Sequence, residues 1–153
     1  MKFALQGIVA MLFLLLFTFC AWYEGSEILD RSGEWKYSTP FSEEVEDSKD
    51  ISNLDHFVYA AKFRPMFPAL MMMTLLYLVM LTGLRVCKGN HNKTASFLTG
   101  LGVTVGLLSG LVWESPTVGG NIFKGMCLII GVVCILLGVL VYFKKTITFK
   151  KAS

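Results

Sequence analysis

The chain has 153 residues, of which 54% are hydrophobic and 16% charged, and its formal net charge is +3. A soluble domain carries about a quarter charged residues, and here the charged residues collect between long stretches that have almost none. This composition excludes an ordinary soluble core and indicates an integral membrane protein.

Four apolar stretches of 19 to 22 residues predict membrane-spanning helices, at about 3–22, 66–84, 95–113 and 122–143. At about 1.5 Å per residue they reach roughly 29 to 33 Å, which matches the hydrocarbon thickness of a bilayer. Backbone groups in lipid must be hydrogen-bonded within their own segment, so such runs exclude buried strands. We therefore expect an all-α integral membrane protein, a single membrane domain of four transmembrane helices arranged as two helical hairpins.

The first stretch also fits a cleaved signal peptide, because a lysine precedes an apolar run. That run is about 20 residues long, which exceeds a usual signal core. Thr18 and Cys20 are small enough to precede a cleavage site, but the bulky Phe17 and Phe19 surround them. A retained helix is the preferred interpretation.

The charges between the helices predict their orientation. The loop 23–65 holds ten of the eleven acidic residues, whereas the loop 85–94 and the tail 144–153 carry only basic ones. Lys and Arg in short flanking segments favour the cytoplasm. Both termini and the loop 85–94 are thus expected in the cytoplasm, and the loop 23–65 and the turn 114–121 outside a cell membrane.

Two short motifs bear on this location. Asn92-Lys93-Thr94 matches a glycosylation acceptor, but its predicted side is cytoplasmic, so a chance match is expected. The C-terminal Lys150-Lys151-Ala152-Ser153 is similar to a dilysine retrieval signal. The endoplasmic reticulum membrane therefore stays an alternative location if the source is eukaryotic.

Aromatic residues mark the predicted outer interface. Trp22 and Tyr23 fall at the end of the first span and Trp113 at the end of the third. Rings with a polar edge settle at the headgroup level, so we interpret these three residues as interface anchors. An acid, Glu24 or Glu114, follows each anchor.

The first half of the outer loop contains an aromatic cluster with neighbouring charges, Glu34-Trp35-Lys36-Tyr37 and Phe41. A solvated loop has little need for three such aromatic rings, so we expect them to pack on something. The cluster either lies back on the membrane or the helices, or forms a partner surface for another protein.

The second half of the loop predicts a mobile stretch and then a short helix. Residues 42–50 are acidic and lack aromatic side chains, which is typical of a solvated segment. Ser52 and Asp55 are spaced as a capping box for a helix that runs to about Phe63. Its apolar stripe would lie flat on the outer leaflet; the stripe consists of Leu54, Phe57, Val58 and Ala61.

Glycines in the second hairpin predict close helix packing. Gly102, Gly106 and Gly110 are spaced four apart, and Gly131 and Gly138 seven apart. Small residues at such spacings let helix backbones approach each other. A tight contact between the third and fourth spans is the first interpretation, and a homodimer seam is the second.

Residues that would carry chemistry are sparse. Five methionines crowd the second span, but three are consecutive and point around the helix, so we expect packing and no metal site. His56 and His91 fall on opposite predicted sides, and Lys124 is the one Asp, Glu, Lys, Arg or His within a span. Coupled transport and intramembrane catalysis use ionisable groups in the membrane. We expect neither catalytic residues nor a cofactor.

The stretch Ala21-Trp22-Tyr23-Glu24-Gly25-Ser26, followed by Glu34-Trp35-Lys36, resembles the YjdJ-like family of small membrane proteins from bacilli and their relatives. This resemblance covers the end of the first helix and the start of the loop. It implies a bacterial cytoplasmic membrane and brings no catalytic residues and no assigned activity.

These observations predict a non-enzymatic membrane protein that acts by association, as an accessory, regulatory or envelope-stress component. Its expected partners are the lipid bilayer and a membrane protein or further copies of itself, and no nucleic acid. The alternative is a small transporter or channel component, which would need oligomerisation to form a polar path.

Overall fold

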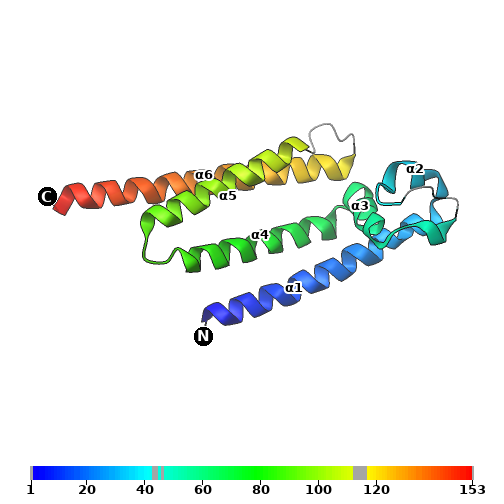
Figure 1. Ribbon diagram of the computed structural model, residues 1–153, viewed down its shortest axis with the longest axis horizontal. Coiled ribbons are helices and arrows are strands. Elements are labelled where there is room, and N and C mark those ends of the chain that lie inside the picture. Colours follow the sequence, from blue (N-terminus) through cyan, green and yellow to red (C-terminus); the bar gives the residue numbers. More distant parts are fainter. Residues whose placement is uncertain (1, 43–44, 46, 112–116, 153) are drawn as a thin grey trace. The chain divides into compact units, whose positions relative to one another are not determined.

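The computed structural model describes residues 2–42, 45, 47–111 and 117–152, apart from the side chains at 2, 37, 111 and 145–152. These residues are almost entirely helical and contain no strand. Figure 1 shows the order of the elements along the chain. The α-helices are α1 (Lys2–Gly25), α2 (Trp35–Ser38), α3 (Asn53–Phe63), α4 (Met66–Val86), α5 (His91–Leu111) and α6 (Val118–Ala152). Three short 3₁₀ helices complete the loop: η1 (Ser26–Asp30), η2 (Ser32–Glu34) and η3 (Ser48–Asp50).

Three helical stretches are long and apolar enough to cross a membrane: Phe3–Asp30, Met66–Val86 and Val118–Lys144. The all-helical class is thereby confirmed, together with three candidate spans. The predicted span 95–113 lies mostly in α5, which is described as far as Leu111 and is not among the three. A fourth span stays a prediction.

Helix α6 continues beyond the predicted boundary at Phe143 and reaches Ala152. Its last nine residues contain neither proline nor glycine, and those two residue types are the ones that most oppose helix continuation. Much of the predicted cytoplasmic tail is therefore helical.

The chain divides into two compact units, the first formed by residues 1–76 with 116–122 and the second by 77–115 with 123–153. In the first unit, α3 packs against the end of α1. Gly25 allows this contact, because a Cβ there would overlap the backbone carbonyl of His56. A Cβ on Gly119, in the first turn of α6, would likewise overlap the carbonyl of Ala61. Backbone contacts thus hold α3 from two elements.

In the second unit, α5 and α6 meet through glycines. A Cβ on Gly102 would lie 2.7 Å from the carbonyl oxygen of Gly131, and one on Gly131 would lie 2.9 Å from that of Gly102 and 3.2 Å from the Gly106 nitrogen. Farther along, a Cβ on Gly138 would lie 2.5 Å from Thr99 Oγ1. No described atom lies within 4 Å of a Cβ built on Gly110. At three of the five predicted packing glycines, Gly102, Gly131 and Gly138, the facing helix leaves no room for a Cβ. Gly106 contributes to the same contact through its backbone.

Candidate functional site: the packed loop of the first unit

The buried carboxylate of Asp55 organises the second half of the loop. Its Oδ1 accepts from the backbone N–H of Phe41 at 3.0 Å, and its Oδ2 accepts from the Ser42 hydroxyl at 2.6 Å. Ser42 Oγ in turn accepts from the Ser52 N–H at 2.9 Å. Asp55 is 0% exposed, and three hydrogen bonds thus join residues 41–42 to the start of α3.

This arrangement corrects the predicted capping box. Ser52 does cap α3, since its side chain accepts from the Leu54 N–H at 3.4 Å. The reciprocal bond from the Ser52 N–H to Asp55 is absent, because Ser42 Oγ takes that N–H and lies between the two groups. A complete capping box occurs instead at η3, between Asp47 and Asp50.

Trp35 anchors the first half of the loop. Its indole Nε1–H donates to the carbonyl oxygen of Ile28 at 2.7 Å, and Ile28 is fully buried. A buried indole N–H needs such a partner. The ring is half-buried in its own loop, whereas the first interpretation laid the aromatic cluster back on the membrane or the helices.

Tyr59 joins this frame from α3. Burial first, and then the hydrogen bond and negative charge of Glu34, raise the pKa of Tyr59 to about 12. Its ring also lies 4.9 Å from that of Phe63, centroid to centroid. With Ala21, Ile28 and Ala60 it forms the most buried part of the unit.

His56 lies on the same face of α3 and is 5% exposed. Its ring lies against that of Trp22 in a tilted arrangement, with centroids 5.7 Å apart and an interplanar angle of 32°. Burial lowers the pKa of His56 below its usual 6.5, and the charge of Asp55 partly opposes this. Nδ1 is buried without a hydrogen-bond partner in the part of the chain that the structure describes. The neutral imidazole is thus the favoured form.

A small acidic cavity of about 330 Å³ lies beside the end of α1. Glu27 Oε1 pairs with Arg64 Nη2 there at 3.0 Å. The cavity is lined by Tyr23, Glu24, Ser26, Glu27, Asp30 and Arg64. Three carboxylates against one guanidinium give this cavity a negative potential that attracts cations.

The predicted partner surface is divided by the structure. Glu34 and Trp35 are half-buried, whereas Lys36 and Phe41 are exposed, Phe41 by 60%. The side chain of Tyr37 lies outside the described part. Of the predicted interface anchors, Tyr23 is exposed and Trp22 is half-buried beneath His56, and Trp113 lies outside the described residues.

The sequence interpretation missed the structural use of Asp55 and His56. It assigned Asp55 to a local cap and gave His56 no role. The signal was present: Asp55, His56, Tyr59 and Ala60 share one helical face, opposite the apolar stripe, and all four are buried. Among the described residues, no group of three or more His, Cys, Asp or Glu side chains could hold a metal ion.

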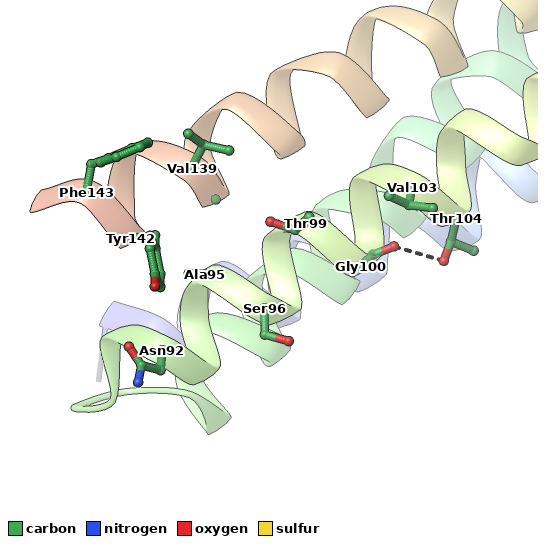
Figure 2. Close-up of a pocket in the computed structure, with 11 residues that line it drawn as sticks. Asn92, Ala95, Ser96, Thr99, Gly100, Val103, Thr104, Val139, Tyr142 and Phe143 are labelled. Atoms are coloured by element: carbon green, nitrogen blue, oxygen red, sulfur yellow. Dashed lines mark hydrogen bonds between the residues drawn. The ribbon is translucent and has the colours of Figure 1, made fainter. Parts of the chain in front are cut away.

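The second unit carries a groove of about 850 Å³ between α5 and α6 (Figure 2). The hydroxyl of Thr104 donates to the carbonyl of Gly100 at 2.9 Å, within its own helix. Such a bond satisfies the hydroxyl locally. The groove is lined by Asn92, Ala95, Ser96, Thr99, Gly100, Val103, Thr104, Gly138, Val139, Tyr142 and Phe143.

Comparison with known proteins agrees with the sequence resemblance. The family model described as a domain of unknown function, DUF4306, matches residues 4–87. The chain belongs to this family. The uncharacterized protein YjdJ of Bacillus subtilis (strain 168) is 34% identical over 89 residues, which cover 52% of this chain and 82% of that protein. The expected resemblance to a YjdJ-like family is thereby confirmed. No solved structure matches the chain.

The match has a clear structural meaning. It begins two residues into α1 and ends at Cys87, directly after α4. It therefore contains α1, the loop with α2 and α3, and α4, while α5 and α6 lie outside it. The packed loop belongs to the part of the chain that the family model describes.

Proposed function

We propose that this chain is a non-enzymatic, multi-pass protein of the cell membrane that acts by associating with another membrane protein, in an accessory, regulatory or envelope-stress role. One observation carries the proposal: the loop has a buried polar frame that fixes the position of an exposed aromatic residue. Asp55 holds the backbone of Phe41, and the Phe41 side chain stays exposed. Exposed aromatic anchors on a rigid support are typical of protein contact surfaces.

The buried polar groups support a structural role over a catalytic one. The Asp55 carboxylate is occupied by Phe41 and Ser42, and the His56 ring packs on Trp22. Neither group faces the acidic cavity, whose lining lies on α1, η1 and Arg64. These side chains therefore serve to position the loop.

The proposed topology has four spans, with α5 as the third in chain order. Arg85, Lys88 and Lys93 flank the turn between α4 and α5, and lysines follow the apolar part of α6. These charges favour a cytoplasmic position for that turn and for both termini. The loop with Phe41 then lies outside, where it would meet the outer part of a membrane partner.

The family match supports placing the shared role in α1, the loop and α4, because it covers residues 4–87. The glycine contact between α5 and α6 would close the second hairpin within one chain. Further copies of the chain would then meet through other surfaces.

Crosslinking in native membranes tests the proposal. Excision of Glu34–Asp50 would remove the Trp35 anchor and the groups bound to Asp55, so a point variant is the sharper tool. Phe41→Ala removes the exposed ring and leaves its N–H on Asp55, and Leu29→Ala removes another exposed apolar side chain of the loop. We expect a captured membrane protein with the native chain and with Leu29→Ala, and loss of capture with Phe41→Ala. Equal capture by all three would contradict the proposal.

The acidic cavity favours a second candidate, a small transporter or channel component that works as an oligomer. Its carboxylates, Glu24, Glu27 and Asp30, would gather cations at the outer end of α1. Liposomes that contain only this protein provide the test. Cation flux that is lost with Glu24→Gln would favour this second function, and absence of flux together with a stable captured complex would favour the first.

A further inference from the structure

One face of α3 buries the polar Asp55 and His56 together with Tyr59 and Ala60, and the opposite face carries apolar side chains. Leu54 is 54% exposed, while its neighbour Asp55 is 0% exposed and His56 is 5% exposed. The opposite face of α3, with Leu54, Phe57, Val58 and Ala61, is exposed or half-buried. A helix in water buries its apolar stripe and presents its polar one. The surroundings of the apolar face are therefore unlike water.

The connection to α4 fixes the depth of α3, if α4 spans the membrane as proposed. The 21 residues of α4 extend about 31 Å at 1.5 Å per residue, which is about the hydrocarbon thickness. Met66 must then lie at the boundary of the hydrocarbon. Only Arg64 and Pro65 separate α3 from α4, and the three Cα–Cα steps that join the two helices span at most about 11 Å. The end of α3 is thus held at the headgroup level.

The contact with α1 gives the same depth independently. His56 lies against Trp22, and the His56 carbonyl fits against Gly25 in the last turn of α1. Tryptophan favours the membrane–water interface. Both ends of the loop therefore bring α3 to the same level of the bilayer.

We infer that the face of α3 formed by Leu54, Phe57, Val58 and Ala61 lies on the boundary between the headgroups and the acyl chains. The helix axis would be parallel to the membrane plane, with Asp55 and His56 turned into the protein. Short amphipathic helices bind in this position through their apolar face. The inference adds a lipid contact to the proposed function and rests on the membrane placement of α1 and α4.

Photolabelling of the full chain in phosphatidylcholine nanodiscs tests the inference. A phospholipid with a diazirine on the first carbons of an acyl chain would report residues at this depth, and mass spectrometry would locate the adducts. We expect adducts on Leu54, Phe57 or Val58 and on the first turns of α4, which begin at Met66, and none on η3. If α4 is labelled and α3 carries no more adducts than η3, the inferred lipid contact is wrong. If α4 is also unlabelled, the membrane placement itself fails.

A pair of variants separates lipid contact from mere proximity. Val58→Asp places a charge on the apolar face, while Lys49→Asp makes a charge change on η3. We expect Val58→Asp to lose the α3 adducts and Lys49→Asp to keep them. Amide exchange of α3 in each variant shows whether the packing on α1 is intact. Unchanged labelling in an intact Val58→Asp protein would overturn the inference, as would a second copy crosslinked through Leu54→Cys.

Discussion

The imidazole of His56 lies against the indole of Trp22 in a tilted arrangement, with ring centroids 5.7 Å apart. This contact joins the end of a predicted membrane span to a helix more than thirty residues later in the chain. It buries a titratable ring that the loop keeps neutral. The attachment of α3 to α1 is therefore expected to depend on pH.

Acidification should loosen α3 from α1. The pKa of His56 is lowered in the packed state from 6.5, so the detached state binds a proton more readily. The contribution of the neutral His56 ring to the attachment of α3 is fully present above pH 6.5. It decreases as the pH falls below 6.5 and is lost once the pH is below the lowered pKa. Amide exchange of α3, corrected for intrinsic rates, measures this change.

Two glutamine variants define the source of the effect. His56→Gln removes the titrating ring and should abolish the pH dependence of α3 exchange in this range. His91→Gln changes an exposed histidine at the start of α5 and should leave the dependence as it is. A slope that persists in His56→Gln would mean that another group titrates.

Gly25→Ala should detach α3 more severely. The added methyl group would overlap the His56 carbonyl, and a backbone atom cannot turn aside as a side chain does. We expect the packing of α3 on α1 to lose about 1–3 kcal/mol of stability, as in overpacked cores. Proteolytic cleavage near Arg64 should then appear. Gly7→Ala is the matched control, since it lies in the same helix and its Cβ meets nothing within 4 Å. Equal protease resistance of both variants would show that the contact does not hold α3.

Local patterns in the sequence predicted most of the long helices, and some of their bounds. The helix expected to end near Phe63 is found at Asn53–Phe63, because Ser52 supplies a cap and Arg64-Pro65 an end. The helix expected over the span 3–22 is found at Lys2–Gly25, because a long apolar run favours one continuous helix. These features depend on neighbouring residues, which a single sequence displays.

Contacts over longer separations were less predictable. Asp55 binds groups 13 and 14 residues earlier, and Trp35 binds a carbonyl seven residues earlier, and neither contact lies within one continuous helix. The glycine spacings in α5 and α6 were visible, but the pairing of Gly102 with Gly131 needs the structure. Sequence patterns show which face a residue occupies and leave its partner open.

Asp55→Ala should release the segment around Phe41. The variant leaves the Phe41 N–H and the Ser42 hydroxyl without their acceptor in a partly buried place, which costs about 1–3 kcal/mol. Faster amide exchange at Phe41 and Ser52 would report the release, because the Phe41 N–H donates directly to Asp55 and the Ser52 N–H reaches it through the Ser42 hydroxyl. Asp30→Ala, at an exposed carboxylate, serves as the control and should leave both amides protected. If exchange at Phe41 and Ser52 is the same in both variants, Asp55 does not organise the loop.

Gly102→Ala should weaken the contact between α5 and α6. Its Cβ would lie 2.7 Å from the Gly131 carbonyl oxygen and 2.9 Å from the Ile135 nitrogen, both closer than real Cβ contacts allow. Because both neighbours are backbone atoms, the helices must separate, at a cost of about 1–3 kcal/mol. Thermal unfolding in detergent and amide exchange of α6 near Gly131 measure the loss.

Gly100→Ala provides the comparison on the same helix. Its Cβ meets nothing within 4 Å, and alanine favours a helix over glycine by about 1 kcal/mol. This variant should therefore be neutral or slightly stabilising, whereas Gly102→Ala should be clearly destabilised. If both variants unfold at the same temperature, the glycines do not define the packing of α5 on α6, and their spacing would instead serve a contact between copies of the chain.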